Sequence, residues 1–277
     1  MKKILVPTDF SDTAENALRV AADLARKFNS KIFLLHMLEL PVNLIDPVMG
    51  TRTNDLPEVV FFTKRAEQKL NQLIQQDFLE GVTVQPILQL HHTLDGIMET
   101  RQRENCDLIV MGSQGATGLQ EMFIGSITEK VVRRSHVPVL VIKESIPDFK
   151  AEKMVFGIDF TDRSREVLSQ VIQLAETLEA KLHLVHVHTG NKEDMWDVEK
   201  DHAEYLKGLD MKAIDSQILH ASSVEQGILQ YADKINADVV GMATHGRKGL
   251  SHFFNGSISE DIANRAKRPV VTFRLPS

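Results

Sequence analysis

The chain has 277 residues, of which 43% are hydrophobic and 25% are charged, a composition typical of a globular protein. Its formal net charge of -6 gives no diffuse attraction to nucleic acid or to anionic membranes, so neither partner is expected. A single cysteine excludes an internal disulfide. The start of the chain shows no signal-peptide pattern, and no apolar run approaches the roughly 18 residues of a membrane span. We therefore expect a soluble, cytoplasmic protein.

Short apolar strands alternate with segments of helical periodicity, which indicates an α/β fold. In the first half the pattern predicts, in chain order, a strand at 4–6, a helix at 14–28, strand 32–35, helix 63–79, strand 82–88, helix 94–104, strand 108–111, helix 126–135 and strand 139–142. Such continuously apolar strands are typical of a parallel sheet with helices on both faces. In a doubly wound sheet of this kind, ligands bind beyond the carboxyl ends of the strands, where the strand order reverses.

The sequence contains an internal repeat. Residues 3–37 align with 153–187 at a constant offset of 150, with ten identities, and 106–141 align with 237–272 at an offset of 131, with 13 identities. We therefore predict two tandem domains, 1–145 and 151–277, each with five parallel strands. The change of offset gives the first copy 19 additional residues, which we expect around the Pro-bearing segment 41–57.

A glycine-rich loop with a G-x2-G-x9-G-S pattern follows the fourth strand. It is formed by Gly112, Gly115, Gly125 and Ser126. Glycine lets the backbone approach a ligand closely, and the amides and hydroxyl at a helix start favour an anion such as phosphate. The alternative is that the glycines only form a turn and that Ser126 only caps a helix. The second copy repeats part of the pattern among diverged residues, which favours phosphate binding.

Together with this loop, three further motifs carry a resemblance to a known family: Pro7-Thr8-Asp9, Leu34-Leu35-His36-Met37 and Val137-Pro138-Val139. The chain resembles tandem members of the universal stress protein family. That resemblance implies a Rossmann-like fold of the adenine nucleotide alpha hydrolase type, with a five-stranded parallel sheet in each copy and ATP or AMP as ligand.

The resemblance also implies which residues of the first copy bind the nucleotide. Thr8, Asp9 and Met37, next to Pro7, would line the adenine and ribose end, and Met111 and Gly112 would touch the sugar. The phosphates would be held by Gly115, Gly125, Ser126 and Ile127.

The second copy keeps part of this set and departs from the rest. Its candidate residues are Asp159, Val187, Met242, Gly246, Gly256, Ser257 and Ile258. Gly157 and Ile158 replace the Pro-Thr pair, and Ala243 replaces the first loop glycine, which adds a methyl group beside the sugar position. His245, Arg247 and Lys248 in turn add potential cations near the phosphates. Either site could dominate, and we favour the first.

Other chemistry is weakly signalled. His183, His186 and His188 could suggest a metal site, but His36 repeats His186 alone, so a core histidine is the simpler interpretation and no metal site is predicted. Asp9 could contact a magnesium ion carried by the nucleotide, whereas we expect Asp12 to cap the first helix. Cys106 precedes a buried strand and is expected to be an inert thiol.

The function that these features favour is that of a stress-response protein regulated by nucleotide binding. The alternatives are a slow ATPase or adenylate-processing enzyme and a nucleotide-free interaction scaffold; no catalytic residue is assigned. Motifs of P-loop, dinucleotide-binding and serine-hydrolase enzymes are missing from the sequence. The apolar last strands, 139–142 and 270–273, predict that the two copies pair edge to edge as an internal pseudo-dimer, with a homodimer also open.

Overall fold

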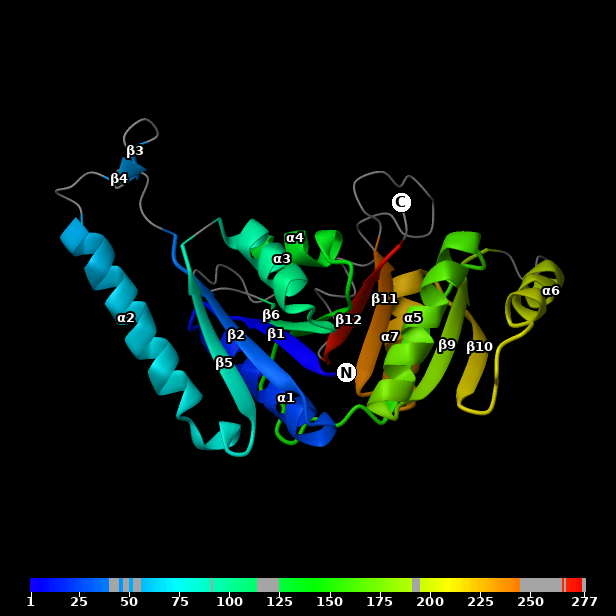
Figure 1. The fold of residues 1–277 in the computed structure, drawn as a ribbon. Coiled ribbons are helices and arrows are strands. Elements are labelled where there is room, and N and C mark those ends of the chain that lie inside the picture. Colours follow the sequence, from blue (N-terminus) through cyan, green and yellow to red (C-terminus); the bar gives the residue numbers. More distant parts are fainter. Residues whose placement is uncertain are drawn as a thin grey trace.

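The protein was analysed as a computed structural model that describes residues 1–39, 45–46, 50–51, 56–90, 92–113, 125–190, 195–244, 266 and 268–275. Ten strands form one continuous sheet in the order β10-β9-β8-β11-β12-β7-β6-β1-β2-β5. The first copy occupies one half of this sheet and the second copy the other (Figure 1).

The first copy contains every strand and helix that the sequence pattern predicts. Its elements are β1 (Lys3–Pro7), α1 (Asp12–Phe28), β2 (Lys31–Met37), β3 (Ile45–Asp46), β4 (Gly50–Thr51), α2 (Leu56–Ile74), the 3-10 helix η3 (Asp77–Leu79), β5 (Thr83–Gln89), α3 (Thr93–Glu104), β6 (Leu108–Gly112), α4 (Ser126–Arg134) and β7 (Val139–Ile142). The strands β5, β2, β1, β6 and β7 pair in parallel, and β3 and β4 form a separate small hairpin. The order reverses between β1 and β6, which is where a doubly wound sheet opens a crevice.

The second copy repeats this plan. Its elements are β8 (Lys153–Gly157), α5 (Asp162–Leu178), β9 (Lys181–His188), α6 (Met195–Tyr205), β10 (Ile214–His220), α7 (Val224–Lys234), β11 (Val239–Thr244) and β12 (Val270–Arg274). All five of its strands are parallel to one another. The expected fold, two tandem five-stranded parallel α/β units, is confirmed.

The additional residues of the first copy lie between the end of β2 and the first turns of α2. The connection from β2 to α2 is longer than that from β9 to α6, as expected, although much of it lies outside the described residues. Helix α2 itself has 19 residues against 11 in α6, and η3 follows it. The connections from α2 to β5 and from α6 to β10 both have eight residues, so part of the extra length extends α2 at its N-terminal end.

The two copies join through their last strands. β12 pairs antiparallel with β7, with Val271 opposite Leu140 and Thr272 opposite Val139. The Thr272 hydroxyl also donates to the Val139 carbonyl at 3.4 Å. Pairing of these two strands removes two exposed sheet edges, so the edge-to-edge association predicted from their apolar sequences is present in the structure.

One hydrophobic cluster extends through both copies on the face covered by α1 and α5. It contains Leu18 and Leu140 from the first copy and Val167 and Val271 from the second. The opposite face has two separate clusters, under α3 and α4 in the first copy and under α7 in the second. The shared cluster couples the stability of the copies, because residues of each half complete the core of the other.

We predict that Leu140→Ala, in the first copy, destabilises the second copy as well. Loss of a buried leucine side chain costs about 2–5 kcal/mol, and this side chain lies in the shared cluster. Both tyrosines and the single tryptophan lie in the second copy, so their near-ultraviolet circular dichroism during urea unfolding reports on that copy alone. An unchanged midpoint of this signal would show that the copies unfold independently.

Candidate functional site

A cleft of about 560 Å³ opens at the carboxyl ends of β1, β2 and β6 in the first copy. Of the ten residues expected to bind a nucleotide there, nine line it: Pro7, Thr8, Asp9, Met37, Met111, Gly112, Gly125, Ser126 and Ile127. Gly115 lies outside the described residues. The parallel strands bring these side chains together from segments more than 100 residues apart, at the switch point where a ligand site is expected.

The turn from β1 into α1 is held by His36 on the neighbouring strand. Its Nδ1 lies 2.8 Å from the carbonyl oxygen of Thr8 and donates to it. The ring packs against Phe10, with the centroids 4.3 Å apart, and Phe10 has a left-handed backbone with φ of 65°. Burial lowers the pKa of His36, although the bond to Thr8 acts in the opposite direction. A neutral imidazole therefore fixes the position of Thr8 and Asp9 at the cleft.

Asp9 has a structural role in this turn as well as a place in the cleft. Its Oδ1 accepts from the backbone NH of Ser11 at 3.0 Å and from the Ser11 hydroxyl at 2.6 Å. The expected cap, Asp12, is wrong: Ser11 is the N-cap of α1 and accepts from Ala14 N, while Asp12 is the first residue of the helix. Serine is favoured at this position because the oxygen of its short side chain can accept from the free amides of the first helical turn.

The second copy builds the same turn. Asp159 accepts from the NH and the hydroxyl of Thr161, and His186 stacks on Phe160, whose φ is 60°. The repeat of aspartate, phenylalanine and histidine is thus explained by the requirements of one turn.

Gly112 ends β6 at a point where α1 approaches it closely. A Cβ on Gly112 would lie 2.8 Å from the backbone carbon of Thr13 and 2.9 Å from its carbonyl oxygen. Thr128 also donates its hydroxyl to the Gly112 carbonyl at 2.9 Å. Glycine is required here by the packing of α1 on β6, a reason different from the approach of a ligand that the sequence suggests.

Helix α4 begins at the cleft with an N-cap residue that has no side chain to cap it. Gly125 is its N-cap residue and has no side chain to accept from the first-turn amides. The Gly125 NH itself is bound to the Ser113 carbonyl at 2.6 Å. Ser126 is the first helical residue and is exposed, so the alternative that it only caps the helix does not apply. The positive end of the α4 dipole is therefore directed to the cleft wall.

Sequence reasoning missed six lining residues: Ala14, Leu35, Glu39, Thr93, Ile97 and Thr128. Glu39 and Thr93 form a pair, because the Glu39 carboxylate accepts from both the NH and the hydroxyl of Thr93. These bonds lower the pKa of Glu39. The pair joins the end of β2 to the start of α3, a contact between segments that no local pattern signals.

The cleft has an apolar floor and an acidic rim. Leu35 and Ile97 are buried, and Met111 is 5% exposed. Among the described lining residues the charged side chains are Asp9 and Glu39. A flat apolar group fits the floor, and an anionic group would have to reach the α4 N-terminus or carry a cation with it.

Only part of the corresponding crevice of the second copy belongs to the described residues. Val187 and Met242, two of its candidate residues, are 2% and 0% exposed. Gly157 lies against Ile228, whose Cδ1 would be 2.7 Å from an added Cβ. The remaining candidates, Gly246, Gly256, Ser257 and Ile258, lie outside the described residues, as do His245, Arg247 and Lys248. The described part of this crevice presents less surface to a ligand than the first.

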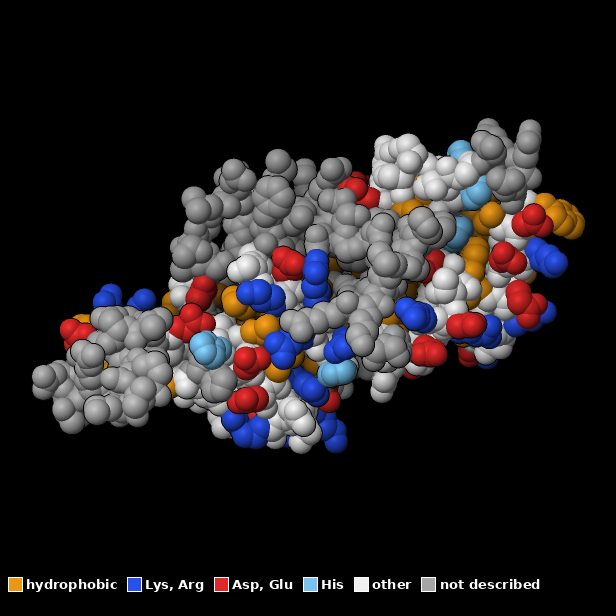
Figure 2. Space-filling model, turned by 90° about the horizontal axis from the view of Figure 1, so that it is seen from above, with side chains coloured by type: hydrophobic (Ala, Val, Ile, Leu, Met, Phe, Trp, Pro, Cys, Tyr) orange, Lys and Arg blue, Asp and Glu red, His pale blue; other side chains and the backbone are white. Residues whose placement is uncertain are grey.

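Histidines gather at the second copy's end of the molecule, as Figure 2 shows from above. His202 Nε2 lies 2.6 Å from the Ser216 hydroxyl, and its ring is 5.7 Å from Phe160, on which His186 stacks. The ring centroids of His188 and His220 are 5.8 Å apart. Within the described ranges, no group of three His, Cys, Asp or Glu side chains is placed to hold a metal ion.

The interpretation of Cys106 as an inert thiol is consistent with its surroundings. It is 3% exposed, and burial raises its pKa to about 11. The thiolate form that reacts with oxidants and electrophiles is therefore rare at neutral pH.

A family model of the universal stress protein family matches residues 1–143 and again 150–274. The chain belongs to this family and contains two tandem copies of its domain. Universal stress protein Slr1230 of Synechocystis is 24% identical over 99% of this chain and 100% of its own length. Universal stress protein MJ0577 of Methanocaldococcus jannaschii is 32% identical over 51% of this chain and 94% of its own.

A solved structure shares the arrangement of both copies. The crystal structure of a universal stress protein from Archaeoglobus fulgidus superposes with a TM-score of 0.75, at 21% identity, over 98% of each chain. At this identity the likeness supports the fold alone. None of the helices in the described ranges has the length and hydrophobicity needed to cross a bilayer.

We predict that Gly112→Ala lowers stability in the absence of any ligand. The new methyl group would collide with the α1 backbone, and such overpacking costs about 1–3 kcal/mol. Urea unfolding of the two proteins measures the difference. Unchanged stability together with lost nucleotide binding would instead assign Gly112 to the approach of a ligand.

We also predict that the second copy loses stability as the pH falls from 7 to 5. Burial lowers the pKa of His186 and of His202. The neighbouring His188 also lowers the pKa of His186, whereas Asp159 raises it. Since the folded pKa values lie below the unfolded value of about 6.5, the unfolded chain binds protons first and stability is lost below that pH. Urea midpoints followed by tyrosine circular dichroism should fall less steeply in His202→Gln. The exposed His92→Gln is the control, and an identical slope in all three proteins contradicts the assignment.

Proposed function

We propose that the first copy binds an adenine nucleotide, ATP or AMP, in the cleft between β1 and β6. The observation that carries the proposal is that the N-terminus of α4, whose N-cap residue is a glycine, and a buried apolar floor line the same cleft. Helix starts without a capping side chain bind phosphate through their backbone amides, and an apolar floor suits a purine base. A nucleotide contains both groups, at the spacing that a single cleft can satisfy.

The lining residues suggest how such a ligand would lie. The phosphates would contact Gly125, Ser126 and Ile127, and the base would lie toward Leu35, Met37 and Ile97 at the ends of β2 and α3. The acidic Asp9 lines the same cleft and would repel a bare polyphosphate. A magnesium ion carried by ATP would remove that repulsion, so magnesium is expected to favour ATP in this cleft.

The described part of the cleft supports binding better than catalysis. Hydrolysis of a phosphoanhydride needs a base, an aligned water molecule and cations at the transition state. Asp9 already accepts two bonds from Ser11, and the described lining residues include no lysine, arginine or histidine. We therefore propose a nucleotide-responsive regulator of the cytoplasmic stress response, in which occupancy of the cleft changes the conformation or the partners of the chain.

The same observations support the first copy as the main site. Its Met37 is half-exposed, whereas the equivalent Val187 is buried. The second copy keeps Gly256 and Ser257 in its sequence and serves as an internal comparison for the first.

We predict that Ser126→Glu weakens nucleotide binding more than tenfold. A carboxylate at the first turn of α4 stabilises the helix by about 0.3–1 kcal/mol, so the fold is retained, while the negative charge repels the phosphates. Isothermal titration with ATP, AMP and cAMP, with and without magnesium, measures the effect. The third ligand is included because one universal stress protein was crystallised in complex with cAMP.

The matched control is Ser257→Glu, which makes the same change at the repeated position of the second copy. Wild-type affinity in Ser257→Glu and loss in Ser126→Glu would support the first site. Loss in Ser257→Glu alone would move the site to the second copy, and no heat of binding in the wild type would rule out the function. Release of phosphate from ATP above the level of Ser126→Glu would favour an ATPase.

A further inference from the structure

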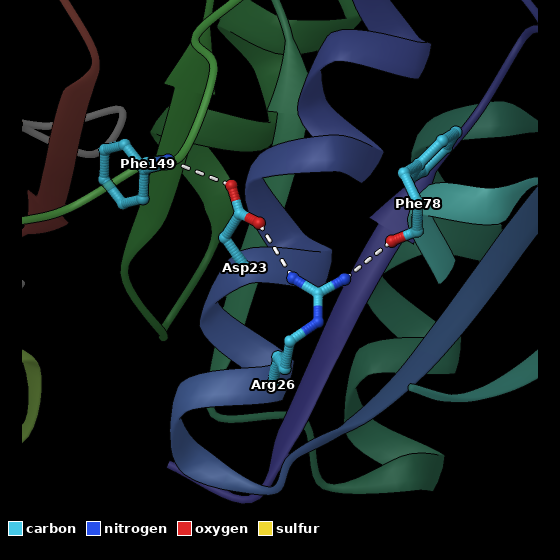
Figure 3. Close-up of polar contacts among 4 residues, drawn as sticks. All are labelled: Asp23, Arg26, Phe78 and Phe149. Atoms are coloured by element: carbon cyan, nitrogen blue, oxygen red, sulfur yellow. Dashed lines mark hydrogen bonds and ion pairs between the residues drawn. The ribbon is translucent and has the colours of Figure 1, made fainter. Parts of the chain in front are cut away.

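A groove lies at the base of each copy, between the C-terminal half of the first helix and the start of an edge strand. In the first copy η3 closes it. Leu79 is 4% exposed, and the Phe78 ring lies under the Arg19 guanidinium at 4.0 Å. Arg26 donates to the Phe78 carbonyl at 2.8 Å while it is paired with Asp23 (Figure 3). An aromatic residue and two arginines therefore seal this groove.

The second copy keeps a leucine at the position of Leu79, Leu209, but lacks the aromatic ring and both arginines. Ile32 of β2 and Leu182 of β9 are equivalent in the repeat. Ile32 pairs with Val84 and Leu182 pairs with Ile214, so Val84 and Ile214 are equivalent as well. Counting back six residues from each places Gly208 at the position of Phe78. Gly208 has φ of 83° and no side chain. The repeat places Ser169 where Arg19 is and Glu176 where Arg26 is. Arg165 of α5 donates to the Lys207 carbonyl at 2.9 Å, so the backbone of this segment is held, but no aromatic ring covers the groove at residue 208.

The unsealed groove is a cavity of about 570 Å³. Its apolar lining consists of Ile172, Ala175, Ala180, Leu182, Ala213 and Ile214. The first copy shows what the fold accepts at this position, namely an aromatic side chain. A cavity of this size and lining has room for more than one aromatic ring.

The rim of the groove keeps a net negative charge after the lining residues that form ion pairs are set aside. Lys181 is paired with Asp215 at 2.7 Å and Glu179 with Lys27 at 2.8 Å. The other charged lining residues are two acidic ones, Glu176 and Asp210, and one basic one, Lys212. The groove is suited to an aromatic segment with basic residues beside it.

The chain itself exposes such a segment on α2. Val60, Phe61 and Phe62 are 48%, 59% and 37% exposed, and the two rings form an edge-to-face pair 5.7 Å apart. Lys64 and Arg65 follow within one turn and are exposed as well. Exposed aromatic side chains that adjoin one another are unusual on a solvated helix and mark an interaction surface.

Helix α2 lies at the outer side of the first copy, whereas the elements that line the open groove, α5, β9 and β10, lie in the second copy, so one chain cannot fill its own groove (Figure 1). We propose that the open groove of the second copy binds the α2 aromatic segment, Val60 to Phe62, of a second copy of this chain. Lys64 and Arg65 would face Glu176 and Asp210, and Glu58 would face Lys212. The two contacting surfaces differ, so the contact is heterologous and forms either a reciprocal dimer or a head-to-tail assembly.

Sedimentation velocity of the nucleotide-free full chain over a wide concentration range tests this contact. The wild type should associate, and Phe61→Ser combined with Phe62→Ser should weaken association more than tenfold, since both side chains are exposed and the fold should survive. Trp196→Ser removes an aromatic side chain that is 77% exposed on α6 and is the matched control. It should leave association unchanged.

Charge variants identify the groove as the receptor. Glu176→Arg and Arg65→Glu should each weaken association several-fold, and the double variant should recover it because the pair is restored with reversed sign. A mixture of the Phe61/Phe62 variant with Glu176→Arg should associate better than either protein alone. A monomeric wild type, or an equal loss in Trp196→Ser, would overturn the proposal and leave the groove to a different aromatic ligand.

Discussion

The bond from the His36 imidazole to the Thr8 carbonyl positions the carboxyl end of the first sheet. It joins β2 to the turn after β1, and Phe10 can adopt its left-handed backbone because the same ring packs against it. That turn sets the start of α1, and α1 in turn approaches β6 so closely that only glycine fits at residue 112. The cleft walls therefore follow from one neutral histidine whose burial disfavours its charged form.

The second copy keeps this frame and fills it differently. Its histidine, phenylalanine and aspartate make the same turn, yet Val187 is buried where the first copy has the partly exposed Met37. At the base of the sheet the relation is inverted, because the first copy is sealed by Phe78 and the second is open. After duplication, each copy could lose one cavity and keep another, since the frame rests on backbone and turn interactions that do not depend on what fills the cavities.

The shared β7–β12 ladder explains why such divergence is tolerated. It merges two small domains into one sheet with a common core, so each copy is supported by residues of the other. Larger cores bury a greater fraction of the surface of the unfolded chain. A local loss of packing in one copy therefore lowers the free energy of unfolding of the whole sheet and not of that copy alone.

The sequence by itself determined the order of strands and helices, the duplication, the pairing of the last strands and nine of the residues at the cleft. The elements and the duplication follow from periodicity and from an internal comparison, both of which are written along the chain, and the set of cleft residues follows from the resemblance to a known family. The tertiary structure alone decided that α1 packing requires Gly112 and that Glu39 joins Thr93. It also decided that the second groove is open. Each of these depends on the distance between segments far apart in sequence, and side-chain packing, which sets those distances, leaves no local pattern to read.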